Sequence, residues 1–81
     1  FDPATAGGFQ SALGNAYDSA GNSKKGLECL QNAMALYLQV VPENHSSLSP
    51  TYNNIGNVQY ALKDYKNSLA SYEAALNGQL T

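Results

Sequence analysis

Apolar residues in the C-terminal half of the chain recur at helical spacing in two stretches separated by a break. The first stretch steps by four, three and seven residues through Leu48, Tyr52, Ile55 and Leu62. The second steps by four, three, four and four through Tyr65, Leu69, Tyr72, Leu76 and Leu80. Each period is typical of a helix that buries one side. Between them, Lys63 and Asp64 mark a break, and Asp64 suits the N-cap of the second helix. We therefore predict a helical hairpin.

The same pattern occurs upstream. A shift of 42 residues places Gly14 on Gly56 and Asn15 on Asn57, and the break at Gly21 falls on Lys63. Four further identical pairs are Lys24 and Lys66, Leu27 and Leu69, Ala33 and Ala75, and Leu38 and Leu80. A fixed period of this kind indicates stacked repeats. The prediction is an all-α fold with two tandem antiparallel helical hairpins of an α-solenoid, at residues 1–41 and 42–81.

Capping signals and prolines set the expected helix limits. Asp2 and Pro3 begin a first helix that extends to about Ala20, because aspartate caps and proline suits the first turn. We predict the other helices at about 23–41, from 46 or 47 onward, and at 65–80. Phe9, Leu13, Ala16 and Tyr17 are predicted to face inward. The mid-helix glycines Gly14 and Gly56 predict close approach of a partner helix, since glycine is otherwise unfavourable there.

These residues resemble the tetratricopeptide repeat family. The second copy has Tyr52, Ile55-Gly56, Tyr65, Tyr72 and Ala75 at the family's positions, and the first has Leu13-Gly14, Tyr17, Leu27 and Ala33. Small residues, Gly26 and Ser68, stand where the two helices of a repeat approach, while Gln10 and Gln59 depart from the usual aromatics. The resemblance implies a right-handed solenoid that binds protein or peptide partners in its concave groove.

The repeat is longer than the usual length of about 34 residues. The additional residues fall between Ala33 and Thr51, where a Pro42…Asn44-His45 linker precedes an Asn53-Asn54 pair. This arrangement is similar to the kinesin light chain subfamily. Two repeats bury little surface, because each needs neighbours on both faces. We therefore expect a fragment of a longer array, within a longer chain or a multi-protein assembly.

Charge and cysteine content narrow the choice of partners and compartment. The net charge is −2, and the four basic residues, all lysines, form no basic cluster larger than the pair Lys24-Lys25. This argues against nucleic acid and against an anionic membrane surface as partners. No apolar run approaches the roughly 18 residues that cross a bilayer. The single Cys29 cannot form an internal disulfide, which fits a reducing, cytoplasmic location.

Few residues are suited to catalysis or metal binding. His45 and Cys29 are the only histidine and the only cysteine, so no zinc-site spacing can be drawn. The acidic residues are scattered, and none pairs convincingly for acid–base chemistry. We expect no catalytic residue, no metal and no cofactor, and hence not an enzyme.

The first helix of each hairpin lines the concave side of such an array. Six positions there are predicted to contact a partner, and we call them the groove residues: Ser11, Asn15, Asp18, Asn53, Asn57 and Tyr60. The resemblance implies that the asparagine amides hold a peptide backbone, and an amide can both donate to and accept from it. The alternative is that these positions are only solvated. No lysine lies among them, so a clamp for a peptide carboxylate is not expected.

Three functions fit this sequence. The first is a scaffold or adaptor that binds partner peptides or proteins in the groove. The second is a purely structural solenoid segment inside a large multi-protein assembly. The third is an accessory segment of a longer catalytic chain.

Overall fold

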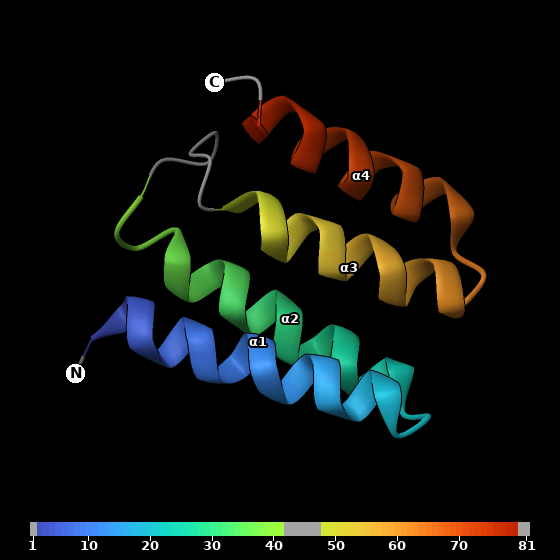
Figure 1. Ribbon diagram of the computed structural model, residues 1–81, viewed down its shortest axis with the longest axis horizontal. Coiled ribbons are helices and arrows are strands. Elements are labelled where there is room, and N and C mark those ends of the chain that lie inside the picture. Colours follow the sequence, from blue (N-terminus) through green and yellow to red (C-terminus); the bar gives the residue numbers. More distant parts are fainter. Residues whose placement is uncertain (1, 42–47, 80–81) are drawn as a thin grey trace.

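The computed structural model describes residues 2–41 and 48–79. It contains four helices: α1 (Pro3–Ser19), α2 (Ser23–Tyr37), α3 (Ser49–Ala61) and α4 (Tyr65–Gln79). Figure 1 shows that they form two antiparallel hairpins, with α3 set against α2. The described residues contain no strand, and the all-α prediction is confirmed. The predictions for His45, the Pro42–Ser47 linker and Leu80 fall outside the described residues.

The starts of α1 and α2 follow the capping signals in the sequence. Asp2 accepts a hydrogen bond from the backbone N–H of Ala4 at 3.1 Å, and Pro3 occupies the first helical position, as predicted. The Thr5 hydroxyl and then the Ala4 N–H hold the pKa of Asp2 below its ordinary value, since both stabilise the charged carboxylate. Asn22 caps α2 in the same way, accepting from the N–H of Lys25 at 3.2 Å.

The two hairpin turns have the same backbone geometry, 42 residues apart. In the first, the Asn22 N–H donates to the Tyr17 carbonyl at 2.8 Å and the Gly21 N–H donates to that of Asp18. In the second, Asp64 donates to Gln59 at 2.9 Å, and Lys63 donates to Tyr60. This is the Schellman pattern, which requires a left-handed residue after the helix. Gly21 has φ +92°, whereas its counterpart Lys63 has φ +64°.

The left-handed lysine leads to a stability prediction. A non-glycine residue in the left-handed conformation destabilises the folded state by roughly 1–2 kcal/mol. Glycine avoids this strain, but it also makes the unfolded chain more flexible, which offsets part of the gain in stability. Lys63→Gly should therefore raise the free energy of unfolding by about 0.5–1 kcal/mol, measured by urea denaturation. The matched variant Gly21→Lys should lower it. If Lys63→Gly and Gly21→Lys changed the free energy of unfolding in the same direction, the two turns would not share this geometry.

The mid-helix glycines lie at helix contacts, as predicted. A Cβ on Gly14 would stand 2.8 Å from the carbonyl oxygen of Gly26, so α1 and α2 touch through their backbones. In the second hairpin, a Cβ on Gly56 would stand 2.9 Å from the Tyr72 ring. The Ser68 hydroxyl donates to the Gly56 carbonyl at 2.8 Å, which joins α3 to α4. Small residues at all four positions keep the helices of each hairpin close together.

The core joins the two hairpins rather than filling either one alone. Leu30 from α2 packs with Ile55 and Val58 from α3, and all three are buried. The partly buried Leu27 and Met34 extend this cluster along α2. The contact between α2 and α3 therefore carries most of the apolar burial between the repeats.

The predicted inward face of α1 is wrong for Phe9, Leu13 and Ala16, whereas Tyr17 is half-buried. Phe9 is 74% exposed, Leu13 is 46% exposed, and Ala16 is also exposed. The physical reason is visible in α3, where Ile55 stands 42 residues after Leu13 and is buried against the preceding helix α2. Among the described residues, no helix precedes α1 to cover the same side.

The predicted inward face of α4 is also largely wrong. Tyr65, Leu69 and Leu76 are exposed, and Tyr72 is half-buried. The matching face of α2 is covered by α3, whereas no described helix follows α4. Leu62, at the C-cap of α3, is likewise 40% exposed rather than inward.

The predicted end of α2 needs correction. Helix α2 ends at Tyr37 rather than near Val41, and residues 38–41 continue in tight turns, with the Val40 N–H donating to the Tyr37 carbonyl. Branched Val40 and Val41 before Pro42 account for this, because β-branching and a following proline both disfavour helix. Helix α3 is described from Ser49, and the predicted start at 46 or 47 lies outside the described residues.

Candidate functional site

The groove residues occupy equivalent positions on two helices. On α3, Asn53, Asn57 and Tyr60 are all exposed. Their steps of four and three residues place them on one face of the helix. The other three groove residues, Ser11, Asn15 and Asp18, lie on α1 at the same steps. Asn15 is exposed, whereas Ser11 and Asp18 are half-buried. Helices α1 and α3 contact each other directly.

Two groove residues already have partners within their own hairpins. The Ser23 hydroxyl donates to the Asp18 carboxylate at 2.6 Å, across the turn between α1 and α2. The Tyr72 hydroxyl donates to the side-chain oxygen of Asn57, which links α3 to α4. The Asn57 amide therefore has its oxygen engaged and its N–H groups still available as donors. Asn57 is therefore better able to donate to a peptide carbonyl than to accept from a peptide N–H.

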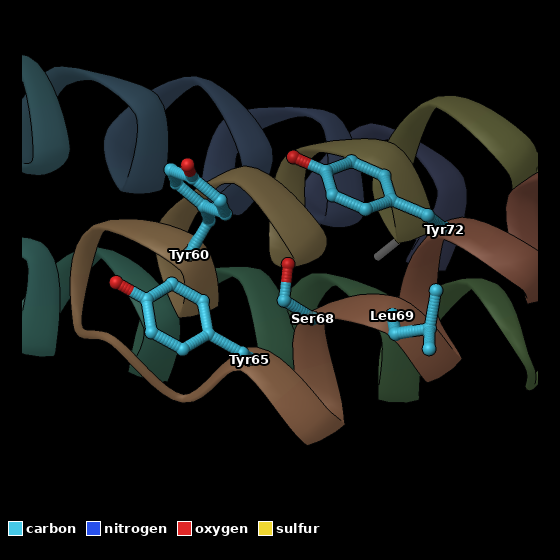
Figure 2. Close-up of a pocket in the computed structure, with 5 residues that line it drawn as sticks. All are labelled: Tyr60, Tyr65, Ser68, Leu69 and Tyr72. Carbon is cyan, nitrogen blue, oxygen red and sulfur yellow. The ribbon is translucent and has the colours of Figure 1, made fainter.

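Beside Asn57 lies a pocket that the sequence did not indicate as a site. The tyrosine pocket, of about 340 Å³, is lined by Tyr60, Tyr65, Ser68, Leu69 and Tyr72. Figure 2 shows the Tyr60 and Tyr65 rings at one end, Leu69 and Tyr72 at the other, and Ser68 between them. The rings of Tyr60 and Tyr65 meet edge to face, with centroids 5.3 Å apart and planes at 69°.

The periodicity of α4 contained the signal for this pocket but led to the wrong interpretation. The periodicity identifies Tyr65, Leu69 and Tyr72 as one apolar face and predicts that this face is buried, whereas Tyr65 and Leu69 are exposed. The exposed groove residue Tyr60 adds a wall from α3. An exposed apolar pocket with aromatic walls is a typical place for an apolar group of a partner.

The helices that carry the groove residues are nearly uncharged. The residues of α3 include no charged side chain, and those of α1 include only Asp18. On α2, the ammonium nitrogen of Lys25 lies 5.9 Å from the centre of the Tyr17 ring on α1. A peptide carboxylate would find no arginine or lysine on either helix.

The described part of the chain offers no grouping of three or more His, Cys, Asp or Glu side chains able to hold a metal ion. Cys29 is buried and unbridged. Over residues 2–41 and 48–79, none of the helices has the length and apolar character needed to cross a membrane.

Comparison with known families agrees with this architecture. The tetratricopeptide repeat family model matches residues 7–80, and the chain belongs to the tetratricopeptide repeat family. Repeats of this family generally mediate protein–protein interaction and are typically non-catalytic. No curated protein and no solved structure matches the chain.

Proposed function

We propose that this chain is a scaffold or adaptor segment that binds an extended peptide along the exposed face of α1 and α3. The observation that carries the proposal is the position of Asn53, Asn57 and Tyr60. They are exposed on one face of α3, next to the tyrosine pocket. Polar amides beside an aromatic pocket suit a ligand with a polar backbone and a single apolar side chain.

The chemistry of each group defines the ligand. The hydrogen bond from Tyr72 restrains the Asn57 amide and leaves its N–H groups to donate to a peptide carbonyl. The exposed amide of Asn53, four residues before it, bonds the neighbouring peptide unit. An apolar side chain enters the tyrosine pocket and packs against the contacting pair of rings, Tyr60 and Tyr65. The near absence of charge on α1 and α3 favours a neutral segment within a chain over a free carboxylate end.

We also propose the finer assignments that the sequence suggested. The 42-residue period and the Asn53-Asn54 pair support a kinesin-light-chain-like subtype. The exposed apolar residues of α1 and α4 support a place in a longer array or in a multi-protein assembly. The unbridged Cys29 supports a cytoplasmic location.

The groove can be tested with peptides that are selected from a displayed random library for binding to the wild-type chain. We expect Asn57→Ala and Asn53→Ala each to weaken binding of the selected peptides by about tenfold, because each removes one hydrogen-bonding amide worth about 1.4 kcal/mol. Tyr60→Ala should weaken it further through loss of the pocket wall. Isothermal titration calorimetry measures the affinities.

The matched control is Asn32→Ala on α2, another exposed asparagine outside the groove residues. It should leave peptide affinity unchanged, and circular dichroism should show the same helix content in every variant. Peptides whose affinity survives both Asn53→Ala and Asn57→Ala would overturn the groove assignment and leave the structural-segment function, which the exposed apolar faces favour.

A further inference from the structure

The two hairpins carry different side chains at one equivalent groove position. Asp18 on α1 and Tyr60 on α3 stand 42 residues apart, and both belong to the groove residues. Asp18 is also the single charged side chain within the ranges of α1 and α3. Any preference of these two helices for a charged ligand residue therefore depends on Asp18.

Contacts with the start of α2 restrain the Asp18 side chain. The Ser23 hydroxyl donates to Oδ1 of Asp18 at 2.6 Å. A Cβ on Gly26 would stand 3.4 Å from Cβ of Asp18 and 3.2 Å from its backbone nitrogen, so α2 packs directly against this residue. From the residues that the structure describes, Oδ2 accepts no hydrogen bond. The half-buried carboxylate is therefore held in place and still has one acceptor oxygen for a ligand.

A peptide that lies across α1 and α3 covers Asp18 and removes water from it. Covering a carboxylate without supplying a hydrogen-bond donor is unfavourable, because a desolvated charge needs a partner. An apolar peptide residue leaves Oδ2 unpaired, and an acidic residue adds repulsion between like charges. A lysine or arginine side chain supplies both a donor and the opposite charge. Asp18 therefore disfavours two classes of ligand residue as well as favouring a third.

The separation of the two groove positions limits where a basic residue can stand in the peptide. Helices in contact have axes about 8–10 Å apart, and α1 contacts α3. An extended peptide in the polyproline II conformation rises about 3.1 Å per residue with three residues per turn. Its residues three apart therefore point to the same side and stand about 9 Å from each other. Such a pair matches the separation between Asp18 and Tyr60.

We propose that the groove recognises an extended peptide in which a lysine or arginine stands three residues from the apolar residue that contacts Tyr60. The basic side chain pairs with Oδ2 of Asp18. This proposal rests on the proposed peptide-binding function and adds one cation to an otherwise neutral ligand segment. The asparagine amides bond the backbone of any peptide, whereas Asp18 determines which side chain is accepted beside them.

Two lysines at the start of α2 limit the strength of this pairing. Lys24 and Lys25 follow Ser23 and are exposed, and the Lys25 ammonium nitrogen lies 5.9 Å from the centre of the Tyr17 ring. Both charges repel a ligand cation. Ion pairs near the surface change affinity by up to about fivefold. We expect the upper part of this range, because Ser23 already restrains the carboxylate and little side-chain entropy is lost.

The peptides selected from the displayed library provide the first measurement. Lysine or arginine should be enriched at the third residue from the apolar residue that the peptides share. One selected peptide is then synthesised with lysine, glutamine or glutamate at that position, and isothermal titration calorimetry measures each affinity. The wild-type chain should bind the lysine form about fivefold more tightly than the glutamine form. The glutamate form should bind most weakly.

Variants of Asp18 identify the residue responsible. Asp18→Asn keeps an oxygen that can accept from Ser23 but removes the charge, so it should abolish the preference for the lysine form. Asp18→Lys should reverse the preference, so that the glutamate form binds most tightly. The matched control is Glu28→Gln, which removes one acidic charge from an exposed position on α2. It should retain the fivefold preference, and circular dichroism should show the same helix content in every variant.

The results separate the role of Asp18 from the peptide-binding function. If the selected peptides require Asn53 and Asn57 but lack an enriched basic residue at the third position, the role of Asp18 is overturned and the groove assignment stands. The same holds if Asp18→Asn retains the preference. An equal loss of preference in Glu28→Gln also overturns it, because the net charge rather than Asp18 would then be the cause. A library that yields no binding peptide overturns both proposals.

Discussion

Replacing Leu30 with alanine should lower the free energy of unfolding by about 3 kcal/mol. Leu30 has no exposed surface and packs against Ile55 and Val58 across the boundary between the two hairpins. Truncation of a buried leucine removes its transfer energy and leaves a cavity, at a cost of roughly 2–5 kcal/mol. For a domain of this size that is a large part of the total stability, about 5–15 kcal/mol. Urea denaturation at low protein concentration measures the change.

Leu38→Ala is the matched control for this effect. The substitution is chemically the same, but Leu38 lies at the C-cap of α2 and is 42% exposed. It should cost less than about 1 kcal/mol, since surface changes away from special features have small effects. If the two alanine variants were equally stable, Leu30 would not be the residue that joins the hairpins.

Replacing Gly14 with alanine should destabilise the chain by about 2 kcal/mol, although alanine is the better helix former. The added Cβ would stand 2.8 Å from the Gly26 carbonyl oxygen and 2.8 Å from Cγ of Leu30. Overpacking against backbone costs about 3 kcal/mol, and the helix-propensity gain of about 1 kcal/mol offsets only part of it. Thermal unfolding should show a lower midpoint.

Gly8→Ala on the same helix isolates the packing effect. A Cβ there meets only the Tyr37 hydroxyl, at the ordinary contact distance of 3.9 Å. Because the added Cβ causes no clash, the higher helix propensity of alanine should make this variant more stable than the wild type by up to about 1 kcal/mol. A stabilising Gly14→Ala would show that α1 and α2 are further apart than the structure places them.

The repeat could be predicted from the sequence because local signals agree with each other. The Asp2 and Asn22 caps, the breaks at Gly21 and Lys63, and the mid-helix glycine Gly14 each act within one hairpin. Such features depend on backbone hydrogen bonds and on the contact between two successive helices. Their 42-residue spacing was sufficient to indicate two copies of one unit.

Which apolar residues are buried could not be predicted in the same way. The periodicity identifies an apolar side of a helix but not whether another element covers it. Leu30 is buried because α3 follows α2, whereas Leu69 is exposed although its helix has the same pattern. For the same reason, the tyrosine pocket was not foreseen. Its walls combine Tyr60 from α3 with α4 residues whose periodicity predicts burial.

The sequence pattern predicts which groove residues share one face of α3, but not the hydrogen bonds that the groove side chains make. Asn53, Asn57 and Tyr60 are exposed on α3, as a groove requires. The bond from Tyr72 to Asn57 and the bond from Ser23 to Asp18 connect residues of neighbouring helices. Single-helix patterns contain no information on these pairs. The hydrogen bond from Tyr72 restrains the Asn57 amide and therefore narrows the ligand geometry that we propose for the groove.

The contact between α2 and α3 is the central feature of the fold, because it packs one hairpin against the next and brings α3 beside α1. A double-mutant cycle between Leu30 and Ile55, each replaced with alanine, tests this contact most directly. Residues in contact are coupled, and we expect an interaction energy of about 1 kcal/mol in the free energy of unfolding. Strictly additive single-variant effects would contradict the packing of α2 against α3.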